Sequence, residues 1–289
     1  MGTKISLRTI WITARVEYIK WLFNPRIIIV AVMMIFIKTL AIEPLLERAI
    51  RMNEPINILE PFIAVGNSGM LIMILPAVYL TLMSDFPIIG GNTLFFIRRT
   101  GKVNWFFGQL LFAIMSIFTY LIAVFGFCML FTAKYCYVGE NWSKVVRQYD
   151  AFFPEEAGNF ASLLLPSNLY NQIDIIPTLL HTFVLTLMYL FLLTLILFMF
   201  KILYLRMAGL FTSIILITFG VATCSIKTSL MWIFPMANTI IWLHYTEIRR
   251  EPIKTISYSY VYFVFLIIAL IVIDIFTLKR ANFYTVEES

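Results

Sequence analysis

The sequence predicts an all-α polytopic membrane protein with six transmembrane helices, and three properties of its 289 residues support that prediction. Apolar residues make up 61% and charged residues only 13%, where soluble domains average roughly half and a quarter. The mean hydropathy is +0.89. Several stretches of about twenty residues hold no charge, which is long enough for a helix to cross a bilayer. A water-soluble globular protein is therefore excluded.

Seven runs of the chain are apolar enough to be candidate spans. A helix rises about 1.5 Å per residue and the hydrocarbon is about 30 Å thick, so some 20 residues suffice. The runs are residues 27–46, 62–83, 105–132, 175–200, 207–226, 228–246 and 257–278. Length alone does not decide how many of them cross.

The distribution of basic residues predicts that both termini lie in the cytoplasm. Cytoplasmic loops are enriched in Lys and Arg, which places the basic first 26 residues and the loop 84–102 on that side. Lys279 and Arg280 then lie inside only if the number of spans is even. One of the last runs must therefore fail to cross, which leaves six spans.

The run 228–246 is the one expected not to cross. It contains Trp232 and Pro235 among several polar residues, a composition that suits a membrane interface or a re-entrant hairpin better than lipid. We expect a re-entrant or outer helical hairpin over residues 228–254. A seventh crossing stays open on charge alone, because it would bring the basic segment 249–254 inside instead.

One integral domain over residues 1–289 is expected, because no linker and no internal repeat divides the chain. The largest polar segment is the outer loop 133–174, which has mixed charge and contains Pro154 and Pro166. It is long enough for a small helix or two but too short for a domain with its own core. We expect it to form a cap.

Catalytic, metal-binding and nucleic-acid-binding functions find little support. The three cysteines, Cys128, Cys136 and Cys224, have no metal-ligand spacing, and the two histidines stand alone. The six excess positive charges collect at the ends of apolar runs instead of forming one basic patch. The sequence also lacks a Gly-x-x-x-x-Gly-Lys-[Ser/Thr] phosphate loop, so we expect no ATPase site and no bound cofactor.

Residues 7–22 predict an interfacial helix lying flat on the inner leaflet. Arg15, Glu17 and Lys20 lie off its apolar arc, whereas Ile12, Val16 and Ile19 interrupt the polar face and imply a second apolar contact, such as a neighbouring helix. A plain membrane-anchoring helix is the alternative. At a period of 3.6 residues the apolar arc comprises Leu7, Ile10, Trp11, Ala14, Tyr18, Trp21 and Leu22.

The loop 84–102 predicts a short helix outside the bilayer. Asn92 can cap a helix over residues 93–100, which stops at Gly101 with two arginines in its last turn. Residues 94–97 give this helix an apolar side that has to be buried. The helix either docks on its own subunit or inserts into a cytoplasmic partner, and we favour the partner.

These features together resemble the membrane subunit of type-2 ATP-binding-cassette (ABC) exporters. The resemblance lies in the order of an N-terminal helix leading into Asn24-Pro25-Arg26, two spans, the loop from Ser84-Asp85-Phe86-Pro87 to Phe96-Ile97-Arg98-Arg99-Thr100-Gly101-Lys102, and a long third span. It implies a six-span permease that dimerises, with an N-terminal connecting helix and a coupling helix in the first cytoplasmic loop. It also implies an outer hairpin before the last span, where the run 228–246 falls. The long loop 133–174 departs from compact members of the family.

The resemblance implies that two copies of a separate ATPase subunit, which hold ATP and magnesium, dock on the loop 84–102. Under it, the cations orient the docking and the aromatic side chains supply the buried contact; anchoring to the inner leaflet is the alternative role. The implied coupling residues are Asp85, Phe95, Phe96, Arg98, Arg99 and Lys102. The implied connecting-helix residues are Trp11, Arg15, Glu17 and Lys20.

The leading hypothesis is thus a multi-pass permease subunit in a bacterial cell membrane, paired with an identical or related permease and exporting an amphipathic peptide, a lipid-linked molecule or a hydrophobic drug. The alternative is a non-transporting membrane scaffold that binds partners through the same loop. Hydroxyl side chains in the second and fifth spans are candidates to line a pathway, although such groups more often bond to helix carbonyls or join helices. They are Ser68, Tyr79, Thr81, Thr212, Ser213 and Thr218.

Overall fold

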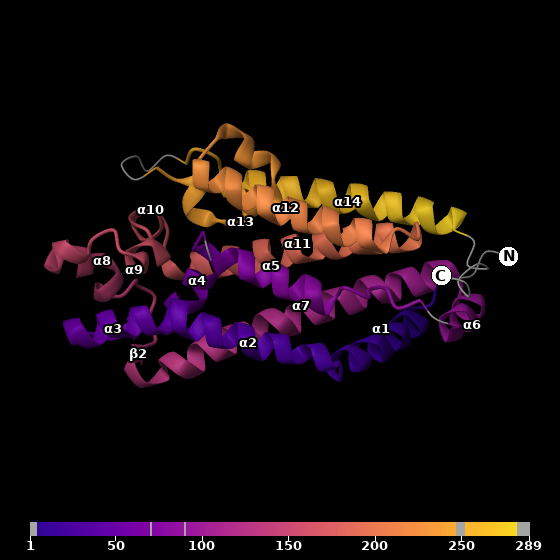
Figure 1. Cartoon of the computed structure of the whole chain (residues 1–289), viewed down its shortest axis with the longest axis horizontal. Coiled ribbons are helices and arrows are strands. Elements are labelled where there is room, and N and C mark those ends of the chain that lie inside the picture. Colours follow the sequence, from indigo (N-terminus) through magenta and orange to yellow (C-terminus); the bar gives the residue numbers. More distant parts are fainter. Residues whose placement is uncertain (1–4, 70, 90, 247–251, 282–289) are drawn as a thin grey trace.

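The computed structural model describes residues 5–69, 71–89, 91–246 and 252–281, which form an all-helical bundle elongated along one axis (Figure 1). Residues 91–94 and 96 are described by their backbone. The N-terminus, the end of the last helix and the short helix α6 (Gly91–Thr100) lie together at one end, called here the termini end. The opposite end, called the cap end, carries the short elements of the loop 133–174.

Five helical segments among the described residues are long and apolar enough to cross a membrane, or six if one bent pair counts as a span. Each contains at least 21 residues, which corresponds to about 30 Å of helix. The all-α class expected from the sequence is therefore confirmed, with five or six helical segments that could span a membrane. The segments are Pro25–Met52, Lys102–Tyr135, α11 (Ile175–Ile202), α12 (Arg206–Ile226) and α14 (Ile256–Arg280).

The first of these segments is one continuous helical path with changes of winding. It opens with a 3-10 turn (Pro25–Ile27) and α2 (Ile28–Ile37), passes through a π-helical turn (Lys38–Ile42), and ends with α3 (Glu43–Met52). Asn53 terminates it in the left-handed conformation, with φ of 53°. The polar α3 reaches past the apolar part of the bundle to the cap end (Figure 1).

The run 62–83 is not one straight span, which corrects the sequence prediction. It forms α4 (Glu60–Asn67) and α5 (Leu71–Leu82), whose axes differ by 80°. Ser68 adopts an extended conformation that ends α4. At this break the backbone carbonyl of Asn67 accepts a hydrogen bond from the indole N–H of Trp242. The break is thus stabilised by a hydrogen bond from a distant segment.

Helix α1 (Leu7–Leu22) runs lengthwise beside α7 (Lys102–Thr132), not across the end of the bundle (Figure 1). The two run parallel, since the amide of Ser6 donates to Asn104 at 3.0 Å and the hydroxyls of Tyr18 and Thr119 lie 2.7 Å apart. A Cβ on Gly108 would lie 2.7 Å from Thr13, so the close approach requires glycine. The sequence predicts that this helix lies flat on the inner leaflet. Its packing along the length of α7, a candidate span, differs from that expectation.

The apolar arc expected for this helix divides between two environments. Ile10, Ala14 and Trp21 are buried, whereas Leu7, Trp11 and Leu22 are exposed together with Ile12, Val16 and Ile19. The residues that imply a second apolar contact are thus exposed, whereas part of the expected arc is buried. The exposed apolar residues suit contact with lipid.

The cap end is built from short elements. Strand β1 (Ile56–Asn57) pairs in parallel with β2 (Cys136–Tyr137), in the register Ile56↔Cys136 and Asn57↔Tyr137. The loop 133–174 also holds 3-10 turns (Ala133–Tyr135 and Pro154–Glu156) and three helices, α8 (Lys144–Phe152), α9 (Phe160–Leu164) and α10 (Ser167–Tyr170). The expected cap of small helices is present.

The run 228–246 forms no helix of spanning length, in agreement with the sequence prediction. It consists of a 3-10 turn (Ser229–Ile233), α13 (Pro235–Thr239) and a second 3-10 turn (Ile241–His244). A Cβ on Gly220 of α12 would lie 2.7 Å from Met236, so α13 packs tightly on α12. These elements lie at the cap end of α12 (Figure 1).

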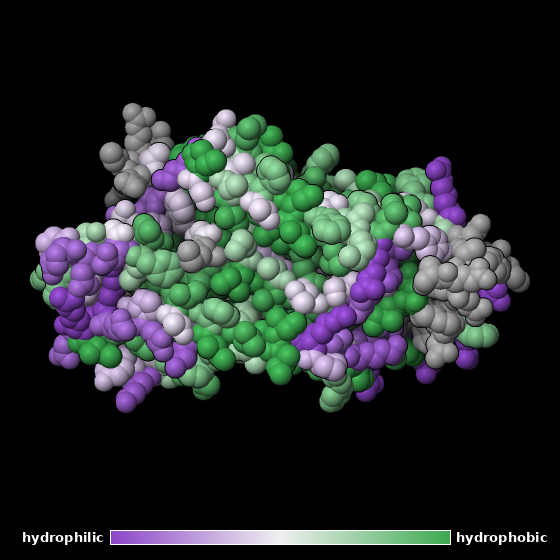
Figure 2. Space-filling model, in the orientation of Figure 1, coloured by the Kyte–Doolittle hydropathy of each residue, from purple (hydrophilic) through white to green (hydrophobic). Residues whose placement is uncertain are grey.

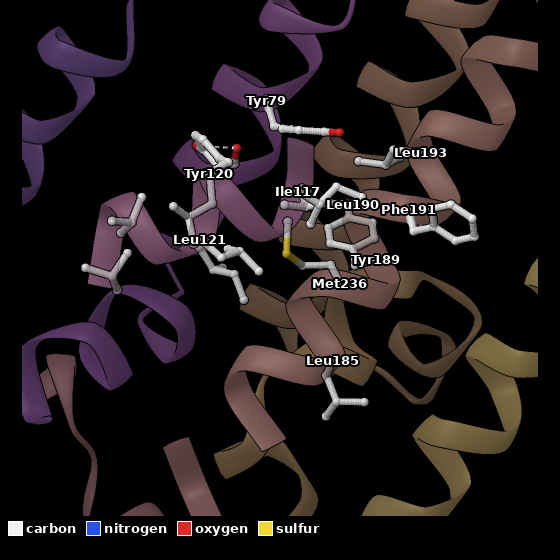
Figure 3. Packing of buried hydrophobic residues seen from close by; sticks show 14 of the residues in the cluster. Tyr79, Ile117, Tyr120, Leu121, Leu185, Tyr189, Leu190, Phe191, Leu193 and Met236 are labelled. Carbon is white, nitrogen blue, oxygen red and sulfur yellow. Dashed lines mark hydrogen bonds between the residues drawn. The ribbon is translucent and has the colours of Figure 1, made fainter. Parts of the chain in front are cut away.

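The core lies between α5, α7 and α11, where large side chains interlock (Figure 3). Tyr120 donates to the carbonyl of Leu75 at 2.9 Å, and the hydroxyls of Tyr79 and Ser116 lie 2.9 Å apart. The surface is apolar over the middle of the bundle in the view of Figure 2, with hydrophilic residues at the cap end and in a band towards the termini end. That pattern is typical of a protein whose middle lies in a bilayer.

Candidate interaction site at helix α6 and Asp85

Helix α6 projects at the termini end of the bundle, outside the candidate spans (Figure 1). Ile97 is buried, whereas Phe95 is 75% exposed. The helix ends because Gly101 takes φ of 84° and its amide donates to the carbonyl of Ile97 at 2.8 Å. Only glycine adopts that φ readily, so a sharp turn leads directly from α6 into α7.

The two arginines of the last turn of α6, Arg98 and Arg99, are exposed. Cations at this position complement the negative end of the helix dipole. Together with Phe95 they give α6 a surface that is both apolar and basic. Of the sequence-predicted coupling residues, these three lie where a partner could reach them; the Phe96 side chain lies outside the described residues.

Lys102 makes contacts within its own chain. Its ammonium donates to the carbonyl of Leu278 at 3.1 Å and to that of Ala281 at 2.7 Å. These carbonyls belong to the end of α14, where helix geometry leaves them without helical partners. Lys102 therefore joins the start of α7 to the end of α14, and its predicted part in docking finds no support in this geometry.

Asp85 also faces its own chain, since its carboxylate forms ion pairs with two arginines from distant elements. Arg26, at the start of the Pro25–Met52 segment, lies 2.5 Å away and also donates to the Ser84 hydroxyl at 2.8 Å. Arg206, the first residue of α12, pairs with the other carboxylate oxygen. The loop before α6 is thus tied to the starts of two helical segments.

Phe86 fixes the same loop by packing against the bundle. It is buried, with its ring centroid 5.7 Å from that of Phe112 on α7 and 6.0 Å from that of Phe198 on α11. Aromatic pairs at such separations add to the stabilisation from burial. The root of the loop is therefore held by apolar packing as well as by charge.

Asn104 joins three elements and was not among the sequence-predicted site residues. Its side-chain oxygen accepts from the amide of Ser6 before α1, and its side-chain nitrogen donates to the carbonyl of Thr100 at the end of α6 at 2.8 Å. α1 and α6 are therefore connected through one side chain at the start of α7. The sequence feature that could have pointed to this residue is an asparagine in the first turn of a long helix, where its side chain can bond to nearby backbone groups.

The connecting-helix residues take part in no shared site with α6 in the described contacts. Trp11 is 52% exposed and Arg15 is exposed, while Glu17 and Lys20 pair with each other at 3.3 Å. Exposed pairs of this kind contribute little to stability.

The candidate pathway residues are scattered. Thr81 and Thr218 are exposed, and their hydroxyls bond to carbonyls of their own helices, those of Ala77 and Ile214. Tyr79 and Ser213 are buried and Thr212 is partly buried, whereas Ser68 borders a hollow at the cap end. The described structure does not bring these side chains around one cavity.

No group of three or more His, Cys, Asp or Glu side chains within the described ranges could hold a metal ion. Comparison of the chain with protein-family models, with curated proteins and with solved structures finds no match. Its function therefore has to be inferred from the geometry of its own residues.

Proposed function

We propose that this chain is the permease subunit of an ATP-driven type-2 ABC exporter, with its termini end facing the cytoplasm. The observation that supports the proposal is α6 itself. It is a helix of ten residues outside the candidate spans that exposes Phe95, Arg98 and Arg99 while its root is fixed to the bundle. An exposed aromatic beside two cations suits an acidic, grooved partner surface.

The contacts that hold α6 to the bundle are suited to transmitting a displacement of this helix to the candidate spans. Asp85 ties the loop before α6 to the starts of the Pro25–Met52 segment and α12, and Asn104 ties its end to α1. A displacement of α6 would therefore reach three helical segments through short, direct contacts. Motions of this kind are transmitted by rigid elements with few hinges.

The energy source belongs to the partner in this proposal. The sequence has no phosphate loop, so ATP and magnesium would be held by two ATPase subunits. A second permease, identical or related, would complete the assembly in the bacterial cell membrane. The transported substrate would be amphipathic or hydrophobic, because the surfaces of the bundle are apolar and poor in fixed charge.

Purification of the tagged full-length chain in a mild detergent tests the proposal. We expect a co-purifying subunit that contains a phosphate loop and hydrolyses ATP. The double variant Arg98→Glu/Arg99→Glu should lose most of that ATPase, because it reverses the charge of the docking surface. Arg8→Glu, an exposed arginine on α1, is the matched control and should retain it.

Two results would contradict the proposal. One is an associated ATPase that the double variant retains at the wild-type ratio. The other is a partner without any phosphate loop that the double variant releases, which would favour the membrane scaffold instead.

A further inference from the structure

Two adjoining hollows lie at the cap end of α12, between that helix, the run 228–246 and the short helices of the cap. The larger measures about 910 Å³ and the smaller about 380 Å³. Asn168, Lys227 and Trp242 border both, so the two hollows adjoin along these residues. No residue of the α6 site borders either of them.

Lys227 supplies a positive charge at the junction of the hollows. It ends α12 in the left-handed conformation, with φ of 55°, and its ammonium lies 5.8 Å from the ring centroid of Trp242. It forms no salt bridge within the described parts of the chain.

Thr228, the next residue, supplies an unused hydrogen-bonding group. It borders the larger hollow, and its hydroxyl oxygen is buried with no hydrogen-bond partner in the described structure. Buried hydroxyls are nearly always paired, because an unpaired one loses its interaction with water. A ligand oxygen in the larger hollow would satisfy this hydroxyl and face the ammonium of Lys227.

Apolar surface predominates in both hollows, the smaller one included. The walls of the smaller hollow include Leu163 from the cap, Val221 from α12 and Ile240 from the run 228–246. Trp232 borders the larger hollow and Trp242 borders both, and tryptophan is enriched where a membrane meets water. The site therefore combines mostly apolar walls with the ammonium of Lys227 and the hydroxyl of Thr228, at the end of a candidate span.

We infer that the two hollows bind an anionic amphiphile, with a phosphate-bearing headgroup at Lys227 and Thr228 and an acyl chain in the smaller hollow. The ammonium and the hydroxyl match phosphate oxygens, and the apolar walls match the chain. A zwitterionic lipid of equal length fills the same volume but brings a second positive charge towards Lys227. This inference does not depend on an ATPase partner.

Native mass spectrometry of the full-length chain in a neutral detergent tests the inference. The probes are dioctanoyl phosphatidylglycerol, dioctanoyl phosphatidylcholine and inorganic phosphate. We expect the phosphatidylglycerol to bind about tenfold more tightly than the phosphatidylcholine, and inorganic phosphate not to compete, because it lacks the chain. Equal affinity for the two lipids, or competition by phosphate at equal concentration, would overturn the inference.

Variants separate the two parts of the site. Lys227→Gln should abolish the preference for the anionic lipid and Lys227→Arg should keep it, which also shows that the position tolerates substitution. Lys134→Gln changes an exposed lysine that borders neither hollow and should have no effect. Ser225→Trp fills the smaller hollow from the exposed surface of α12 and should weaken both lipids alike. Retention of the anionic preference in Lys227→Gln would exclude the assigned headgroup position.

Discussion

The two ends of the molecule use charge in opposite ways. At the cap end, acids and bases pair across elements, as in the pairs Arg48–Asp150, Arg51–Glu155 and Lys144–Glu54. At the termini end, Asp85 binds two arginines at the root of a helix whose own arginines are exposed. The ion pairs of the cap end thus join its elements to one another, whereas those of Asp85 fix the root of α6 and leave the arginines of this helix exposed.

The centre of the cap is the buried carboxylate of Glu60. It accepts from the amide of Asn57 at 3.1 Å, from the amide of Ser143 at 2.6 Å and from the hydroxyl of Ser143 at 2.9 Å. Ser143 in turn caps α8 by accepting from the amide of Val146. One carboxylate therefore links β1, the start of α4 and the start of α8.

The largest effect on stability is expected from Glu60→Ala. The change leaves two buried amides and one hydroxyl without an acceptor, and such groups cost about 1–3 kcal/mol each. We expect a loss of about 3 kcal/mol or more, measured by thermal unfolding in detergent, with early proteolysis in the loop 133–174. The exposed Glu140→Ala is the control. If Glu60→Ala melts with the wild type, the cap does not depend on this carboxylate.

The sequence predicts some features of the two ends and misses others. The long spans are predicted because each is an apolar run with at most two charges, and a non-crossing run 228–246 follows from its proline and polar residues. The break in the run 62–83 was missed because counting charges ignores helix breakers, although Gly66-Asn67-Ser68-Gly69 stands in its middle. The cap hydrogen bonds join residues such as Glu60 and Ser143, 83 positions apart, which no local pattern reveals.

The candidate site is predicted only in part, because local patterns indicate its helix but not its contacts with distant segments. A helix follows from Gly101 and the apolar residues before it, and the structure confirms a helix there, but it begins at Gly91, so Asn92 lies inside it and not at its N-cap. An amphipathic arc does not distinguish a lipid surface from a neighbouring helix, so the sequence allows a contact of α1 with another helix but does not identify α7. Asp85 is the only acid between Glu60 and Glu140, which marks it as a partner for distant arginines without saying which ones.

A second prediction concerns pH at the cap end. His244 is fully buried outside the candidate spans; its Nδ1 lies 2.9 Å from the carbonyl oxygen of Lys254 and its Nε2 lies 3.2 Å from Ser259. Burial lowers its pKa to about 4, and the nearby Lys254 charge contributes in the same direction. The folded protein therefore keeps this imidazole neutral down to about pH 4.

The unfolded chain binds that proton below about pH 6.5, so stability should fall as pH decreases from 6.5 to 4, by at most about 1.4 kcal/mol per pH unit. Above pH 6.5 the contribution is constant. Melting temperatures of the wild type and of His244→Gln between pH 7.5 and 4.5 measure this effect. The slope should be shallower in the variant, and identical slopes would mean that His244 is not the titrating group.

The smallest effect on stability is expected from Asp85→Asn. This substitution also gives the sharpest contrast between the two ends of the molecule. The three side chains of its ion-pair cluster are about 35–47% exposed, and pairs at such sites contribute about 0–1 kcal/mol. The melting temperature should therefore move far less than in Glu60→Ala. Hydrogen exchange of the amides at residues 84–89 should nevertheless become faster, because the loop loses its contacts with Arg26 and Arg206. Asp150→Asn, which removes a partner of Arg48 at the other end, should leave exchange at residues 84–89 unchanged. Unchanged exchange in Asp85→Asn would mean that the packing of Phe86 and the hydrogen bond from Arg26 to Ser84 suffice to fix the root of α6, without the ion pairs of Asp85.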